Sequence, residues 1–300
     1  MGIFVNSDNS AFQVALNSEI YIDKTGLLTY TNKVMNTLQG YVCVSRPRRF
    51  GKSMAANMLT AYYSRGCDSR ELFAGLEIAE DKNFTRYLNK YDTVFLNVQE
   101  FLSATHNVDE MLKALQRRVL AELKQAYPGV AEGEQLIWVM MDVYAQTGRS
   151  FVILIDEWDC LFREYASDTE AQKKYLDFLR AWLKDQDYVG LAYMTGILPI
   201  KKYGSHSALN MFIEYSMTDP GDVAQYFGFT EEEVDALCQE YGMSFEETKA
   251  WYNGYGLWTH SREGDQFYSM YSPKSVVEAM LRHKFGTYWN QTETYEALKV

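Results

Sequence analysis

The chain has 300 residues, of which 47% are hydrophobic and 23% are charged. This composition is ordinary for a globular protein and supplies enough apolar side chains for a full core, which excludes global disorder. The 40 Asp and Glu residues outnumber the 29 Lys and Arg residues, and the formal net charge of −11 argues against a broadly cationic nucleic-acid binder. No apolar run approaches the roughly 18 residues of a membrane helix, the N-terminus lacks a signal pattern, and the four scattered cysteines indicate neither a disulfide framework nor a zinc site. We therefore expect a soluble, cytoplasmic protein without a membrane partner.

Short apolar runs alternate with amphipathic stretches through the first 218 residues. Buried strands are predicted at 41–45, 93–98, 151–155, 188–195 and 211–217. Helical spacing of apolar residues marks 53–63, 108–127 and 175–183, and the last of these follows a capping-box spacing at Ser167 and Glu170. Because strands and helices alternate, the fold class is α/β, with a parallel sheet covered by helices on both faces.

The pattern changes after about residue 218. Thr230 with Glu233 and Ser244 with Glu247 have the spacing of capping boxes that open helices, and Ser272-Pro273 is a favourable start for a third helix. No clear buried strand follows. The sequence therefore predicts an α/β core over residues 1–218 and a helical appendage over residues 219–300.

The strongest chemical signal lies between the first strand and its helix, in Ser45-Arg-Pro-Arg-Arg-Phe-Gly-Lys-Ser53. A P-loop surrounds phosphates with backbone amides at a helix N-terminus, with a lysine for the β- and γ-phosphates and a hydroxyl for magnesium. Gly51, Lys52 and Ser53 fit these roles. Arg46 replaces the first glycine of the general pattern, and Gly-Lys-Ser alone is common enough by chance to mark an ordinary surface turn.

A second element supports the P-loop interpretation. The strand at 151–155 is a β-branched apolar run that ends in Asp156 and Glu157, as a Walker B strand does. In that motif the aspartate serves magnesium and the following carboxylate polarises the attacking water. Thr195, at the end of the next strand, is a candidate for contact with the γ-phosphate or with that water. These features predict an ATPase of the additional-strand type.

Taken together, the motifs resemble the predicted AAA-ATPase-like family of bacterial and archaeal proteins. The matching segments span most of the chain: YIDKT at 21–25, RPRRFGKS at 46–53, LIDEWD at 154–159, TGI at 195–197, FGFTEEEV at 227–234, WYNGY at 251–255 and YSPKSV at 271–276. The resemblance makes Arg46 a family trait, and Trp158 and Ser272 are mild departures from the family pattern. It implies ATP as the substrate with Mg²⁺, and a nucleic-acid role only by association.

The candidate site residues fall into three groups. We assign catalysis to Glu157, Lys52 and Thr195, magnesium to Ser53 and Asp156, and nucleotide binding to Arg48, Arg49, Phe50, Gly51, Lys52, Ser53 and Met54. The three arginines Arg46, Arg48 and Arg49 suit phosphate contact, a partner chain, or pairing with nearby carboxylates. The aromatic residues Trp251, Tyr252, Tyr255 and Trp258 suit either base stacking or packing of the appendage on the core, and we favour packing.

Members of the family often continue into a nuclease-like domain of the PD-(D/E)XK type. That fold holds magnesium with an acidic residue and a D/E-x-K strand. Glu122-Leu-Lys124 and Glu247-Thr-Lys249 have the spacing, but both lie in helical patterns. We expect either a truncated chain or an ATPase without this domain.

Three functions remain open on the sequence. The first is an ATPase whose hydrolysis drives a conformational switch, with a protein partner or self-association. The second is a nucleotide-gated interaction module that hardly hydrolyses ATP and regulates a partner or nuclease domain. The third is a P-loop kinase for a small molecule, which the Asp156-Glu157 pair disfavours because that pair suits water activation.

Overall fold

Five parallel strands form the central sheet of the computed structural model, which describes residues 2–200, 208–261 and 264–291. The strand order is β2–β3–β4–β1–β5, and the strands are β1 (Tyr41–Ser45), β2 (Asp92–Asn97), β3 (Phe151–Asp156), β4 (Val189–Gly196) and β5 (Ile213–Tyr215). The predicted parallel sheet is confirmed, with strand ends displaced by one or two residues. Because β4 pairs with both β1 and β3, the Thr195 strand separates the phosphate-loop strand from the Asp156 strand, which is the arrangement that the predicted additional-strand type implies.

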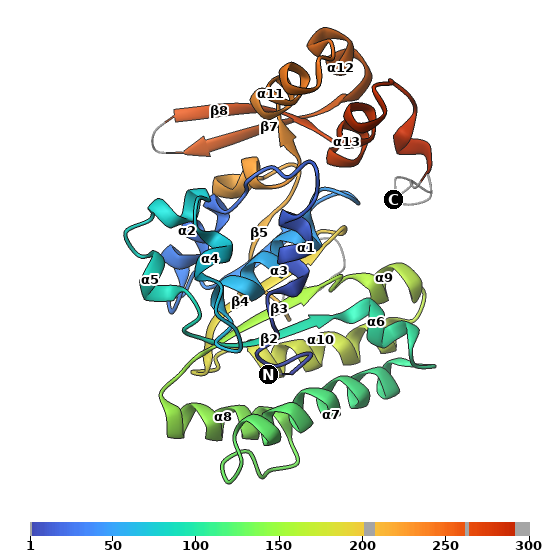
Figure 1. Cartoon of the computed structure of the whole chain (residues 1–300). Coiled ribbons are helices and arrows are strands. Elements are labelled where there is room, and N and C mark those ends of the chain that lie inside the picture. The colour runs from blue at the N-terminus through green and yellow to red at the C-terminus, as the bar shows by residue number, and fades with distance from the viewer. Residues whose placement is uncertain (1, 201–207, 262–263, 292–300) are drawn as a thin grey trace.

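Helices cover both faces of this sheet (Figure 1). Alternate residues of β3 point to opposite faces: Ile153 and Ile155 join the core on one side, and Val152 and Leu154 join the core on the other. The first side is covered by α7 (Val108–Ala126), α8 (Leu136–Thr147) and α10 (Thr169–Leu183); the second is covered by α1 (Ser10–Leu16), α2 (Gly26–Val34) and α3 (Lys52–Tyr63). The cap of α10 is Asp168, whose side chain accepts from the Ala171 amide, so the capping box expected at Ser167 is wrong by one residue.

Shorter helices complete the core. They are α4 (Arg70–Phe73), η1 (Glu77–Glu80), α5 (Phe84–Tyr87), α6 (Val98–Ser103) and α9 (Cys160–Glu164). Two of them, α6 and α9, follow the carboxyl ends of β2 and β3 and contact each other. In the described parts of the chain, every helix is too short or too polar to span a bilayer.

The C-terminal unit, residues 219–291, contains strands as well as helices. Its helices are η4 (Gly221–Tyr226), α11 (Glu231–Tyr241), α12 (Phe245–Tyr252), α13 (Pro273–Arg282) and η5 (Tyr288–Gln291), and its antiparallel sheet has the order β6–β8–β7, with β6 (Phe229–Thr230), β7 (Asn253–Ser261) and β8 (Gly264–Tyr271). The capping box of α11 and the Pro273 start of α13 are confirmed. The expectation of a unit without strands is wrong, because the outer part of the β7–β8 hairpin is exposed and the segment therefore lacks a continuous apolar run.

Contacts made by Lys24 and Phe50 are among those that join the C-terminal unit to the core. Lys24 Nζ lies 2.5 Å from Glu233 Oε1 and donates to the carbonyl of Gln225. The rings of Phe50 and Tyr255 meet edge to face with their centroids 5.1 Å apart. Tyr255 therefore packs the appendage on the core as predicted, whereas Trp258 lies on the outer face of the hairpin with 58% of its surface exposed.

Candidate functional site

The phosphate loop connects β1 to α3 at the carboxyl edge of the sheet. Gly51 is the N-cap of α3 and has a φ of 86°, a left-handed conformation that glycine adopts at little cost. Arg49 is also left-handed, with a φ of 67°. These two residues turn the chain so that α3 begins at Lys52, and the unpaired amide groups of its first turn suit an anion.

An open cavity of about 690 Å³, named the phosphate cavity for its position, lies against this loop, and most of its lining residues are of charged or polar types. It is lined by Arg48, Arg49, Gly51, Lys52, Ser53, Met54, Asn97, Gln99, Glu157, Arg163 and Pro273. Six of the seven residues predicted for nucleotide binding are therefore brought together. The exception is Phe50, which is buried and has its ring against Tyr255. Four of the lining residues are cationic and one is anionic, so the cavity suits a ligand with several negative charges.

Lys52 is folded back onto its own loop. Its Nζ donates to the carbonyl oxygens of Arg46 at 3.0 Å and of Pro47 at 2.9 Å, and the residue is only 5% exposed. Burial lowers the pKa of Lys52, and the nearby carboxylates of Glu157, Asp156 and Asp159 partly oppose that shift. Within the described residues, the hydrogen-bond partners of this buried cation are uncharged carbonyl oxygens, and an anionic phosphate would be a stronger partner.

Asp156 and Thr195 meet at the ends of adjacent strands. The Oδ1 atom of Asp156 accepts from the Thr195 hydroxyl and from the Glu157 amide, the latter at 3.0 Å. Both side chains are buried and neither belongs to the cavity lining. Both of these bonds use the Oδ1 atom. Asp156 Oδ2 is a carboxylate oxygen, the kind of ligand atom that magnesium prefers.

Glu157 reaches the cavity from a strained backbone. Its φ of 53° is left-handed, a conformation that costs a non-glycine residue energy and clusters at functional sites. Its carboxylate forms an ion pair with Arg163, whose Nε also lies 3.4 Å from Asp159 Oδ2. Burial raises the pKa of Glu157, and the charges of Arg163 and Lys52 oppose the rise.

The three arginines of the loop have different environments. Arg48 and Arg49 line the cavity. Arg46 is 1% exposed and donates to the carbonyls of Ser45 at 3.0 Å and of Tyr215 at 2.8 Å, while its guanidinium faces the ring of Phe227. Burial lowers the pKa of Arg46 to about 10. Arg46 thus ties β1 to β5 and does not line the cavity.

A second, apolar cavity of about 270 Å³ adjoins the first and shares Gly51, Met54 and Pro273 with it. Three separate parts of the chain build its walls: the segment before α2, the first turns of α3, and the C-terminal unit. The lining residues are Phe12, Ile20, Tyr21, Ile22, Lys24, Phe50, Gly51, Met54, Ala55, Met58, Tyr226, Gly228, Phe229, Pro273, Lys274 and Val277. A cavity with a cationic lining joined to an apolar one suits a ligand that has an anionic part and an apolar part.

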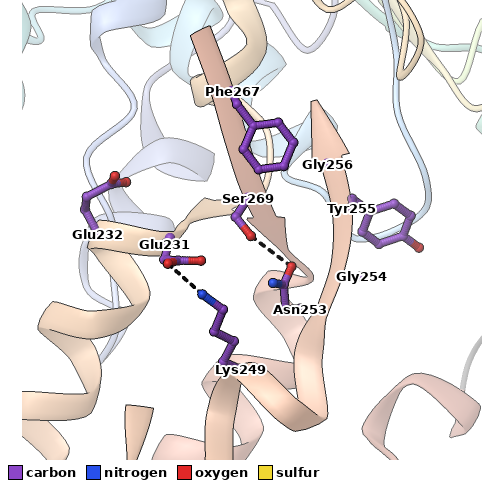
Figure 2. Close-up of a pocket in the computed structure, with 9 residues that line it drawn as sticks. All are labelled: Glu231, Glu232, Lys249, Asn253, Gly254, Tyr255, Gly256, Phe267 and Ser269. Atoms are coloured by element: carbon purple, nitrogen blue, oxygen red, sulfur yellow. Dashed lines mark hydrogen bonds and ion pairs between the residues drawn. The ribbon is translucent and has the colours of Figure 1, made fainter. Parts of the chain in front are cut away.

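A further pocket of about 470 Å³ lies on the C-terminal unit, between the start of α11 and the hairpin (Figure 2). Lys249 Nζ lies 2.9 Å from Glu231 Oε1 there, and the Ser269 hydroxyl donates to Asn253 Oδ1 at 2.9 Å. None of the predicted site residues lines this pocket. Tyr255 connects it to the phosphate loop, because this residue lines the pocket and its ring contacts Phe50.

Sequence reasoning missed four residues of the phosphate cavity: Asn97, Gln99, Arg163 and Pro273. Asn97 ends β2 beside Asp156, its partner in the strand register, and Gln99 directly follows the strand predicted at 93–98, so the polar residues at this strand end were an available signal. Arg163 is four residues after Asp159 and six after Glu157, but no pattern in the sequence shows that the chain turns into a short helix there. Within the described residues, no cluster of three or more His, Cys, Asp or Glu side chains is arranged to hold a metal.

Comparison with known proteins identifies the family. The model of the family described as "Predicted AAA-ATPase" matches residues 10–205. An uncharacterized protein from the region 5′ of vnfD in Azotobacter chroococcum mcd 1 is 26% identical over 283 residues, which cover 91% of this chain and 51% of that protein, so the chain spans about half the length of this relative. Among solved structures, the Aeropyrum pernix ORC2 protein, described in ADPNP-ADP complexes, covers 78% of this chain and 55% of its own at 11% identity, with a TM-score of 0.36.

Proposed function

The chain belongs to the predicted AAA-ATPase family, and from this premise we propose that it binds Mg-ATP and hydrolyses it to drive a conformational switch. The observation that carries this proposal is the pair of adjoining cavities around Gly51. The cationic cavity offers Lys52 and Ser53 to the phosphates, and the apolar cavity offers Met54 and its neighbours to the nucleoside.

Each predicted residue has a role in this scheme. Lys52 would exchange its loop carbonyls for the β- and γ-phosphates, with Arg48 and Arg49 adding positive charge. The Ser53 hydroxyl and the Asp156 carboxylate would hold magnesium, which neutralises charge on the phosphates. Glu157 would orient the attacking water, while Thr195 fixes Asp156 through its hydroxyl.

The contacts between the core and the C-terminal unit support a switch. Phe50 lies inside the phosphate loop, its ring packs on Tyr255, and its carbonyl accepts from the Gly228 amide at 3.2 Å. Movement of the loop around phosphate is therefore passed to two points of the C-terminal unit. A loop that has two arrangements, set by the γ-phosphate, is a common basis of nucleotide switches. We infer that this movement acts on a protein partner or on a second copy of the chain in the cytoplasm.

One observation favours the alternative of a nucleotide-gated module with little hydrolysis. Both key charged groups are engaged elsewhere: Lys52 with loop carbonyls and Glu157 with Arg163. If Glu157 kept Arg163 as its partner after ATP binds, water would lack its orienting carboxylate. Such a module would regulate its partner by nucleotide occupancy alone.

Phosphate release from Mg-ATP separates the candidate functions. We expect release above background without any added acceptor, at a rate that rises with ATP concentration to saturation. Tight binding without release would support the module, and release or transfer only with a small-molecule acceptor would support the kinase. Magnesium is tested in the same assay, since chelation should abolish turnover and restored Mg²⁺ should recover it.

The apolar cavity predicts a separable effect on nucleoside binding. Val277 of α13 lines this cavity but not the phosphate cavity. Val277→Trp would fill the space that the base requires, so we expect the affinity for ADP to fall about tenfold or more, since 1.4 kcal/mol of lost apolar burial suffices for that factor. The affinity for pyrophosphate should stay unchanged. Isothermal titration measures both, with the exposed Leu281→Trp on the same helix as control; an equal loss of pyrophosphate binding would contradict the assignment.

A further inference from the structure

Arg163 is the one cation of the phosphate cavity that, within the described residues, is ion-paired with the proposed catalytic carboxylate. Its side chain is 17% exposed and contacts two carboxylates, those of Glu157 and Asp159. Arg163 belongs to α9, far from the phosphate loop along the chain, yet it lines the same cavity as Lys52 and Ser53.

The two carboxylate partners of Arg163 are held very differently. Asp159 is fully buried, and its Oδ2 accepts from the amides of Ile197 at 3.0 Å and Leu198 at 2.8 Å. It is therefore a fixed counter-ion. The Glu157 side chain is 23% exposed, and Arg163 is the partner that holds its carboxylate in the described structure. Glu157 is therefore the exchangeable partner.

A terminal phosphate would compete for Arg163 at this point. Phosphate oxygens attract the planar guanidinium in the same two-pronged geometry as a carboxylate, and with more charge. We propose that Arg163 is a positioning residue that exchanges Glu157 for the γ-phosphate of bound ATP and so releases Glu157 to orient water. Asp159 keeps Arg163 in place during the exchange, and Arg163 has an anionic partner before and after it. ADP, which lacks the γ-phosphate, leaves the Glu157 pair intact. This inference rests on the proposed nucleotide site and names how that site distinguishes ATP from ADP.

The test compares affinities for Mg-ADP and for a non-hydrolysable Mg-ATP analogue. Arg163→Ala should lose about tenfold of the preference for the analogue, as expected for a charge-assisted contact, while ADP affinity stays the same. Arg163→Lys should keep part of the preference. Glu157→Gln, which removes the competing charge, should bind the analogue several-fold more tightly. That gain should vanish in Glu157→Gln/Arg163→Ala, because the two changes act through one contact.

The controls separate this inference from the function on which it rests. Arg180→Ala removes an exposed arginine that pairs with Asp177 outside the cavity, and it should change neither affinity. ADP affinity also reports whether each variant is folded. Should Arg163→Ala fail to fold, Arg163→Lys, alone and combined with Glu157→Gln, replaces it in the same comparison. An unchanged analogue preference in the Arg163 variants, or a Glu157→Gln gain that persists without Arg163, overturns the exchange while leaving the nucleotide site intact. Absence of Lys52-dependent ADP binding in the parent protein overturns the proposed function itself.

Discussion

Lys52→Ala should weaken ATP and ADP binding by about 2 kcal/mol or more, which corresponds to roughly thirtyfold in the dissociation constant. The ammonium group is buried beside the phosphate cavity, so its contact with phosphate would be charge-assisted and little screened by solvent. Among the described residues, this group bonds to the carbonyls of Arg46 and Pro47 and forms no ion pair. The fold should therefore tolerate the substitution. Titration of both nucleotides with magnesium present measures the effect.

Lys113→Ala is the matched control for this experiment. Lys113 is exposed on α7 and does not line either half of the predicted nucleotide site. Its replacement should leave both affinities at the parent values. A folded Lys52→Ala protein that binds ATP as tightly as the parent would remove the P-loop assignment, and with it the proposed activity.

The core was predictable because its signals are local or periodic. The β3 strand is a continuous apolar run, since both of its faces are covered by helices, and such a strand differs from an amphipathic helix in composition and length. Gly51, Lys52 and Ser53 were recognisable because the phosphate loop needs these residue types in direct succession. The place of the Thr195 strand between the phosphate-loop strand and the Asp156 strand followed from the usual arrangement of additional-strand ATPases, which these motifs indicated.

The features that sequence did not predict depend on contacts between distant segments. The β7–β8 hairpin has glycines at 254 and 256 and exposed aromatic rings at Trp258 and Phe267, so its pattern does not distinguish it from a loop. The apolar cavity is assembled from three parts of the chain that only the fold brings together. Arg163 is similar: its partnership with Glu157 depends on the left-handed turn at Glu157, which no residue preference encodes.

These contacts change how the candidate carboxylates are ranked. On sequence, Asp159 is a reasonable second choice for the group that activates water, because it follows Glu157 by two residues. The structure places Asp159 in the interior, where backbone amides of Ile197 and Leu198 hold it, and it does not line the phosphate cavity. Glu157 is therefore the carboxylate of this segment that reaches the cavity within the described residues.

Glu157→Gln should accordingly reduce ATP turnover by roughly 10²–10⁴-fold, the usual contribution of a positioned general base. Glutamine keeps the shape of the side chain but removes its negative charge and its capacity to accept a proton, and ATP binding should persist.

Asp156→Asn should instead weaken the magnesium-dependent part of binding, because it alters a carboxylate assigned to the cation. Glu164→Gln, an exposed residue of α9 that accepts from Gln99, is the matched control and should hydrolyse ATP at the parent rate. Steady-state phosphate release together with titration of the ATP analogue distinguishes these cases. Parent-like turnover in Glu157→Gln would show that no carboxylate at this position activates water, and since Asp159 is committed to the backbone, the attacking water would then have to be oriented from outside the LIDEWD segment.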